Sequence, residues 1–256
     1  MNTDTKVSIL MLTHNAPEYV DIALRSLAEH KPVGIQCEIV VVDNASDAPT
    51  QRLVSELKDE GLIDVLYLSP ENTLFAGGNN IAARLAASDA THFVLLNSDV
   101  QIHDDKWLPV LLSRHTRGAV SFGVAMDPLR IDGYCLLIDA DLYREYPLDE
   151  GHQWWWSVTK QQAALLTAGY AVGGFAEHEK YIHHFGGKSG SAFESAKGMN
   201  VSRSEVFEWF HGREPEIFDR GAKGEIPGHV QPAPTARLVA RSRRMVGGIL
   251  RRVGLR

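Results

Sequence analysis

Polar side chains that are suited to bind a cation or a nucleotide come directly after apolar runs in this sequence. The run Phe93-Val94-Leu95-Leu96 is followed by Asn97-Ser98-Asp99, and Asp99 supplies a carboxylate, which hard divalent cations prefer as a ligand. Earlier apolar runs end in the same way, at Thr13, Asn15, Asp43 and Asn44. The alternative is that these residues only cap a helix or form a polar turn.

The apolar runs themselves predict the elements that position these side chains. Strands are predicted over 7–12, 38–42, 65–68 and 93–96, and helices follow the first three strands, the third of them over 81–87. Strands that alternate with helices and are almost continuously apolar indicate an α/β fold with a mostly parallel sheet flanked by helices. Ligands bind beyond the carboxyl ends of such strands, so we expect the polar strand ends to meet at one edge.

The second half of the chain is less regular. We expect a helix over 107–112, a strand over 134–138 and a helix over 161–168, followed by a stretch rich in glycine and histidine over 173–190. We also expect one domain over residues 1–225, and a proline-containing linker with a basic tail over residues 226–256. Because apolar residues alternate with arginines in that tail, it is predicted to bind an anionic membrane surface as an amphipathic helix. The alternative is a disordered, solubilising tail.

Composition excludes several classes of protein. Hydrophobic residues make up 44% and charged residues 23% of the 256, as in ordinary globular proteins, and the formal net charge of −6 argues against nucleic-acid binding. Cys37 and Cys135, the only cysteines, are expected to be buried thiols. With no signal peptide or bilayer-spanning run, we expect a cytoplasmic protein, held at most peripherally on the inner face of the cell membrane.

Four stretches carry a resemblance to a known family. They are Val7–Asn15, Val40-Val41-Val42-Asp43-Asn44-Ala45-Ser46, Asn72–Asn80 and Leu95-Leu96-Asn97-Ser98-Asp99-Val100. In this order and at these intervals they resemble family 2 glycosyltransferases with the GT-A fold, and most closely a rhamnosyltransferase-like bacterial branch that builds surface polysaccharides. The resemblance is good over about the first 100 residues, looser to about residue 210, and does not cover the arginine-rich tail.

The resemblance implies a metal-dependent site for a nucleotide-diphospho-sugar. Asp99 would bind a divalent metal, Mg²⁺ or Mn²⁺, which neutralises the diphosphate leaving group, and Asn97 stands where the family's first metal-motif Asp usually lies. A late histidine would complete the metal shell, with His184 favoured and His183 as the alternative. The remaining residues implied for donor binding are Thr13, Asn15, Asp43, Asn44, Gly77, Gly78, Asn79, Arg84, Asn97 and Ser98. An Asp43 carboxylate that reads the imide N–H of uracil or thymine would make the donor a UDP- or dTDP-sugar.

The sequence departs from the family where the catalytic base is expected. Inverting members need a general base for the acceptor hydroxyl, which the family places in a Glu-Asp pair at the start of the helix predicted here over 161–168. This sequence has Trp154-Trp155-Trp156-Ser157-Val158-Thr159 instead. Asp149, Glu150 and Asp132 are the candidate bases. Each of them is alternatively an ordinary loop acid.

Three consecutive tryptophans cannot all face one core in a helix or a strand. At least one of Trp154, Trp155 and Trp156 is therefore expected to face a groove, where its ring would stack on an acceptor sugar or pack against lipid.

These observations predict a glycosyltransferase that moves a sugar from a UDP- or dTDP-sugar to a glycan or lipid-linked glycan acceptor. The absent Glu-Asp pair leaves open a second possibility, a catalytically silent relative that binds nucleotide sugar or assists a partner enzyme. A dehydrogenase is disfavoured because no Gly-x-Gly-x-x-Gly turn follows the first strand.

Overall fold

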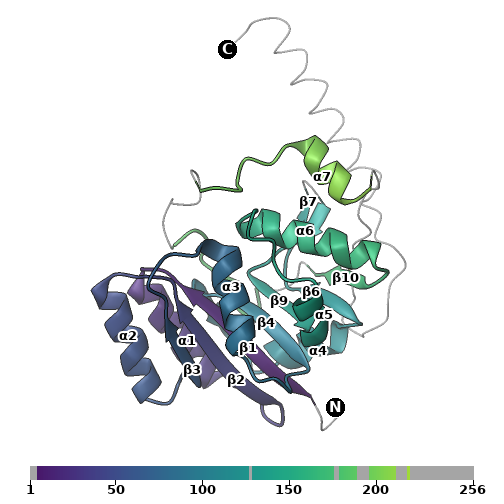
Figure 1. Cartoon of the computed structure of the whole chain (residues 1–256). Coiled ribbons are helices and arrows are strands. Elements are labelled where there is room, and N and C mark those ends of the chain that lie inside the picture. The colour runs from purple at the N-terminus through teal and green to yellow at the C-terminus, as the bar shows by residue number, and fades with distance from the viewer. Residues whose placement is uncertain (1–4, 127–128, 176–178, 189–195, 212–217, 220–256) are drawn as a thin grey trace, which may run out of the picture.

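One twisted sheet of eight strands organises the chain in the computed structural model, which describes residues 5–126, 129–175, 179–188, 196–211 and 218–219 (Figure 1). Every neighbouring pair of strands is parallel except the two pairs made by β9, which is antiparallel to both of its neighbours. In spatial order the strands are β12 (Phe218–Asp219), β10 (Ala171–Gly174), β6 (Gly118–Ser121), β9 (Cys135–Asp139), β4 (His92–Asn97), β1 (Lys6–Thr13), β2 (Gln36–Asp43) and β3 (Val65–Leu68).

Two small antiparallel sheets lie outside the main sheet. β5 (Val100–Ile102) pairs with β11 (Ile182–His184), and β7 (Val124–Met126) pairs with β8 (Leu129–Ile131). The first of these pairs joins segments that are about 80 residues apart in sequence, and it places His184 opposite Val100.

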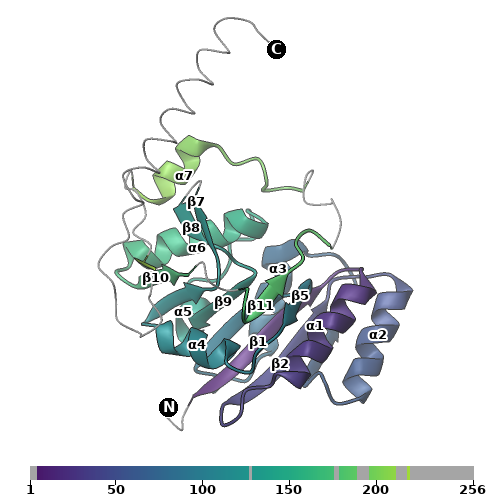
Figure 2. The same ribbon diagram turned by 180° about the vertical axis from the view of Figure 1, so that it is seen from behind.

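Helices cover both faces of the main sheet, as Figures 1 and 2 show from opposite sides. One apolar core lies between the sheet and the helices α1 (Pro17–Glu29), α2 (Ala48–Asp59) and α4 (Trp107–Arg114). A second core lies between the sheet and the helices α3 (Leu74–Leu85), α5 (Ala140–Glu145) and α6 (Trp154–Thr167). A short helix, α7 (Arg203–Trp209), packs on the outside of α6. Because helices bury both faces of the sheet, side chains on both sides of its strands are apolar, and the strand sequences are almost continuously apolar.

The four predicted N-terminal strands and the mostly parallel sheet are confirmed, and so is the predicted strand before Asp139. Two predicted helix starts are wrong. α3 begins at Leu74 rather than at 81, and α6 begins at Trp154 rather than at 161. In α3, contacts outside the helix outweigh the poor helix propensity of Gly77-Gly78-Asn79-Asn80. The side chain of Asn80, for example, donates to the Leu148 carbonyl and accepts from the Leu148 N–H.

Cys135 is a buried free thiol as expected, whereas Cys37 is only partly buried. Within the described residues, no helix is long and apolar enough to cross a membrane. The predicted domain boundary at 225/226 and the basic tail over 226–256 lie outside the described residues.

Candidate active site

A cavity of about 400 Å³ opens at the edge of the sheet where β1, β2 and β4 end. This volume lies within the range of small-molecule sites, and the position is the one expected for ligands of a parallel α/β sheet. Many of the residues singled out from the sequence line it. They are Asn44, Asn79, Asn97, Ser98, Asp99, Asp132, Trp154, Trp155 and His184.

Four residues that line this cavity, or directly follow a residue that does, have backbone conformations that are unusual for residues other than glycine. Asn15 and Ala45 follow β1 and β2, Leu74 begins α3 and Trp154 begins α6, and all four have φ between 44° and 59°. Such conformations cost roughly 1–3 kcal/mol each unless the side chain is Asn or Gly, and they cluster at functional sites. The surrounding fold therefore holds these loops in place against their own conformational preference.

Asp99 and His184 are brought together by the pairing of β5 with β11. The His184 Nε2 atom lies 3.2 Å from Oδ1 of Asp99, and Oδ2 of Asp99 accepts a hydrogen bond from the Lys188 backbone N–H. Tyr134 stacks against the His184 ring at 4.4 Å between centroids, with 9° between the ring planes. The two side chains are thus held in one orientation before any ligand binds.

Electrostatics favour the ionised form of Asp99. Burial alone would raise the pKa of this carboxyl, but the hydrogen bond and charge of His184, together with the Lys188 N–H, lower the pKa below its usual value of 3.8. Asp99 is therefore an anion at neutral pH, as a metal ligand must be.

The neighbouring histidine points elsewhere. His183 is exposed, and its ring contacts Phe185 and faces His103 rather than Asp99. Successive residues of a strand point to opposite sides, so only one histidine of the pair can reach the cavity. The geometry favours His184 as the metal ligand over His183.

The Asp99–His184 pair fits a divalent cation. Two ligand atoms of one octahedral ion at about 2.1 Å are separated by about 3 Å, close to the 3.2 Å between these two atoms. Mg²⁺ and Mn²⁺ commonly take one or two protein ligands and complete their shell with phosphate oxygens and water. Asn97, whose amide nitrogen lies 3.5 Å from His184 Nε2, adds a neutral polar group beside them.

Asp43 and Thr13 lie beneath the cavity surface rather than on it. Both are fully buried. The Asp43 carboxylate accepts hydrogen bonds from the Thr13 hydroxyl at 3.1 Å and from the Ser46 N–H at 3.0 Å. In this structure the two residues join the ends of β1 and β2, and a direct contact between Asp43 and a nucleobase stays a prediction.

Asn44 and Asn15 also fix loops. The Asn44 side chain donates to Asn72 Oδ1 and accepts from the Thr73 N–H, each at 2.8 Å, while Asn15 accepts from the Asp47 N–H. His14 and Asn72 line the cavity beside Asn44 and were not predicted from the sequence.

Gly78 is in close contact with β1 rather than with the cavity. A Cβ atom at Gly78 would lie 2.2 Å from Cδ1 of Leu12, so the missing side chain lets α3 pack closely on β1. Arg84 is exposed in the last turn of α3, and the α3 residues that line the cavity are Leu74, Phe75 and Asn79. The structure places Gly77 and Gly78 within α3 rather than before a helix. Donor binding by the glycine pair and by Arg84 stays a prediction.

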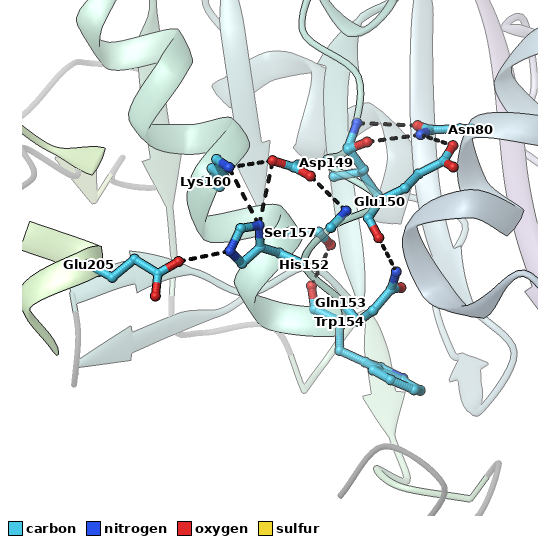
Figure 3. A network of polar contacts seen from close by, with 11 residues as sticks. Asn80, Asp149, Glu150, His152, Gln153, Trp154, Ser157, Lys160 and Glu205 are labelled. Carbon is cyan, nitrogen blue, oxygen red and sulfur yellow. Dashed lines mark hydrogen bonds and ion pairs between the residues drawn. The ribbon is translucent and has the colours of Figure 1, made fainter. Parts of the chain in front are cut away.

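Two of the three candidate bases belong to a network outside the cavity (Figure 3). Asp149 forms an ion pair with Lys160 and accepts from the Gly151 N–H at 2.7 Å. Burial would raise the pKa of Asp149, but these partners lower it below 3.8, which makes the carboxylate a weaker base. Glu150 accepts instead from the Asn80 amide at 3.0 Å.

Asp132 is the candidate base that lines the cavity. It stands in the loop before β9, and its Oδ1 accepts from the Gly133 N–H at 2.7 Å. Because β9 is antiparallel to β4, the residues before β9 reach the same edge of the sheet as those after β4. The start of α6, where the resemblance places the family's carboxylates, presents Trp154, Trp155 and Val158 to this cavity.

The tryptophans separate by environment. Trp154 points away from the polar network in Figure 3, and both Trp154 and Trp155 line the cavity. Trp155 is 37% exposed. Trp156 packs beside Trp209 of α7 and donates its indole N–H to the Met199 carbonyl at 3.0 Å.

Several lining residues were missed from the sequence. Tyr134 directly follows Asp132-Gly133, and His14 lies between two predicted site residues, so both had a positional signal. Phe75 and Asn72 lie in one of the four stretches that carry the resemblance, whereas nothing in the sequence marked Arg130. The missed lining residues named here are His14, Asn72, Phe75, Arg130 and Tyr134.

A comparison of the sequence with protein families matches residues 8–144 to Glycosyl transferase family 2, which is more than half of the chain. The chain belongs to this family. The expected GT-A fold and the glycosyltransferase class are confirmed, while nothing distinguishes a rhamnosyltransferase-like branch. None of the curated proteins searched matches the chain in sequence.

Solved structures with the same fold are distant in sequence. The mannosyltransferase PcManGT from Pyrobaculum calidifontis, in complex with GDP-Man and Mn²⁺, has a TM-score of 0.55 at 20% identity, over 64% of this chain and 52% of its own. Residues 1–349 of TarS from S. aureus give a TM-score of 0.56 at 15% identity, over 80% of this chain and 69% of TarS. The TarS complex with UDP gives 0.51 at 17% identity, over 63% and 55% respectively. The chain thus spans between about half and two thirds of these proteins.

Proposed function

We propose that this glycosyltransferase transfers a sugar from a UDP- or dTDP-sugar to a glycan or lipid-linked glycan, with inversion at the anomeric carbon, in bacterial surface polysaccharide synthesis. The observation that carries the proposal is that one cavity holds both Asp99–His184 and Asp132. Asp99 and His184 are suited to bind the donor diphosphate together with a metal. The carboxylate of Asp132 is suited to accept a proton from an acceptor hydroxyl.

Asp99 and His184 would hold a divalent cation, which supplies Lewis-acid stabilisation of the diphosphate when bound. The ligands of two structural neighbours support a donor of this class, since PcManGT is in complex with GDP-Man and Mn²⁺ and TarS with UDP. The choice of UDP or dTDP depends on the resemblance and on Asp43. His14 and Asn72 are the polar side chains that this cavity offers next to Asn44.

Asp132 would act as the general base. As the acceptor oxygen forms its bond to the anomeric carbon, the acceptor proton moves to the Asp132 carboxylate, and the bond between the anomeric carbon and the diphosphate breaks with its electron pair on the diphosphate. A single displacement of this kind inverts the anomeric configuration. This role fills the place left by the missing Glu-Asp pair and disfavours the catalytically silent alternative.

Trp154 and Trp155 would bind the acceptor. Their rings line the cavity together with Asp132, so a sugar stacked on one of them would have its hydroxyls near the base. Recognition of a lipid carrier and of a membrane by residues 226–256 is part of the same proposal, but depends on the sequence of the tail alone.

Calorimetry of the full chain against UDP, dTDP, GDP and ADP, each with and without Mn²⁺ or Mg²⁺, tests the donor half of the proposal. We expect the uracil or thymine diphosphates to bind more tightly than the purine ones, and only with metal. Equal binding of all four diphosphates would contradict the donor assignment, and binding that ignores the metal would contradict the metal site. A hydrolysis assay with the preferred donor, in which release of the nucleotide is measured, then separates an active enzyme from a silent relative.

A further inference from the structure

A second group of potential metal ligands lies at the opposite edge of the sheet from the cavity. His92 is the first residue of β4, His115 follows α4, and Asp139 is the last residue of β9. One ligand atom from each of the three lies within 4.8 Å of the others. The five residue steps from His92 to Asn97 span about 16 Å of strand, so this group is separate from Asp99 and His184.

One nitrogen of the His92 imidazole has a hydrogen-bond partner. The Thr91 hydroxyl donates its hydrogen to the Lys6 carbonyl at 2.8 Å, and its oxygen lies 2.8 Å from Nδ1 of His92. With Nδ1 as the donor to that oxygen, the lone pair on Nε2 is available to a cation. A histidine whose second nitrogen is fixed in this way is typical of metal sites.

The other two side chains are also fixed. Asp139 Oδ2 accepts from the Gly118 N–H at 2.7 Å and lies 3.1 Å from Nε2 of His115, which also lies 3.3 Å from the Gly118 carbonyl. Nε2 of His115 would therefore give up its proton when a cation binds. The rings of His92 and His115 meet edge to face at 5.0 Å between centroids. The side chains of His115 and Asp139 are only 9% and 14% exposed, so a cation between them would lose much of its water shell to protein ligands.

Asp139 shares the guanidinium of Arg117 with a second carboxylate, that of Asp141. Arg117 lies 3.3 Å from Asp139 Oδ1, but its shorter contact, 2.6 Å, is with Asp141. The Arg117 side chain is 53% exposed, so it can turn toward Asp141 and solvent when a metal binds Asp139.

We propose that His92, His115 and Asp139 form a site for a borderline divalent cation, with Zn²⁺ as the best fit. Two imidazoles and one carboxylate match the preferences of Zn²⁺, whereas Mg²⁺ prefers oxygen ligands alone. The ligands come from β4, from the segment before β6 and from β9, so the ion would connect the antiparallel strand β9 to both of its neighbours. A water molecule would complete the tetrahedron.

The test uses the full chain with Asp99→Asn, which removes the charged ligand of the donor site. Titration with Zn²⁺ by calorimetry, and with Co²⁺ by visible absorption, measures affinity and ligand geometry. We expect one Zn²⁺ per chain, a tetrahedral Co²⁺ spectrum, and a higher melting temperature with Zn²⁺. His92→Ala in this background should weaken binding more than the roughly 10–100-fold that follows loss of an outer-shell partner.

The matched control is His103→Ala in the same background. The rings of His103 and the exposed His183 lie 6.5 Å apart between centroids, so these two histidines are a second place where Zn²⁺ could bind non-specifically. His103→Ala should leave Zn²⁺ affinity unchanged. Asp139→Asn provides a second ligand variant of the same size. Absence of Zn²⁺ binding in the Asp99→Asn chain would overturn the proposal, as would binding that survives both His92→Ala and Asp139→Asn. Since no sugar donor is used, failure here is distinct from failure of the proposed transfer reaction.

Discussion

Tyr134 lies flat against the imidazole of His184, with 9° between the ring planes and 4.4 Å between their centroids. This stack joins the loop that carries Asp132 to the strand that carries His184, the proposed metal ligand. The proposed donor and acceptor halves of the cavity are therefore in direct contact, and each proposal can be tested while the other is monitored.

The first prediction concerns the metal. His184→Ala should raise the Mn²⁺ concentration needed for half-maximal activity by more than the roughly 10–100-fold that follows loss of an outer-shell partner, because a direct ligand is lost while Asp99 is kept. His183→Ala, the matched control, should behave like the wild type, because His183 faces away from Asp99. The measurement is the initial rate of transfer, or of donor hydrolysis, against metal concentration. An effect of His183→Ala as large as that of His184→Ala would reverse the assignment.

The second prediction concerns the base. Asp132→Asn should lower kcat by roughly 10²–10⁴-fold, the usual contribution of a general base, and leave the Kd of the nucleotide diphosphate nearly unchanged. Asp149→Asn should keep most of the activity, since Asp149 is paired with Lys160 outside the cavity. Single-turnover rates and calorimetry of the same variants provide both numbers. A normal kcat in Asp132→Asn would return the question of the base to Glu150.

The third prediction separates the three tryptophans. Trp154→Ala and Trp155→Ala should raise the acceptor KM by up to about tenfold, since loss of a stacking contact of about 1 kcal/mol changes affinity by nearly that factor. Trp156→Ala should instead lower the free energy of unfolding by roughly 3–5 kcal/mol if its site cannot collapse, because it packs against Trp209. Chemical denaturation run beside the kinetics distinguishes the two effects. Unchanged KM in both folded cavity variants would remove the acceptor role.

The fourth prediction concerns the packing of α3 on β1. Gly78→Ala should destabilise the protein by about 1–3 kcal/mol, because the new Cβ would meet Leu12 at 2.2 Å. In a chain that already carries Leu12→Ala, Gly78→Ala should lower the free energy of unfolding by less than it does in the wild type. A double-mutant cycle of unfolding free energies measures this coupling, and simple additivity would show that the contact is not the cause.

The fifth prediction is a pH dependence of stability. The pKa of Asp149 in the folded protein lies below its usual value of 3.8. Burial would raise this pKa, but the hydrogen bonds from Lys160 and Gly151 lower it. The ionised carboxylate therefore stabilises the fold above that usual value, and the contribution disappears as the pH falls through the lower folded value. Wild type should be more stable than Asp149→Asn at pH 7, and the two should converge in acid. A constant difference at every pH would contradict the ion pair.

The parts of this fold that follow from local pattern were predictable. Continuous apolar runs ending in polar residues predicted β1, β2, β3 and β4, and the topology of a parallel sheet then placed Asn97, Ser98 and Asp99 at one edge. Helix starts at Leu74 and Trp154 were not predictable, because both are set by tertiary contacts that outweigh local propensity.

The site was predictable only where chemistry and strand ends coincide. Asp99 met these conditions, whereas His184 was expected only from the resemblance to the family's late histidine segment. Asp43 has the right residue type at the right strand end, yet its burial depends on hydrogen bonds to Thr13 and Ser46 that no pattern shows. Arg130 enters the cavity through a small hairpin, β7–β8, whose short strands carry no periodic signal.

The reversed direction of β9 has a consequence for how this family can evolve. Two separate segments, the one before β9 and the start of α6, both border the cavity. A carboxylate can therefore arise in one segment before the carboxylate of the other segment is lost. The sheet and the proposed donor half of the cavity would stay intact. Descendants of a single ancestor could in this way keep the same reaction while exchanging the residue that performs its proton transfer.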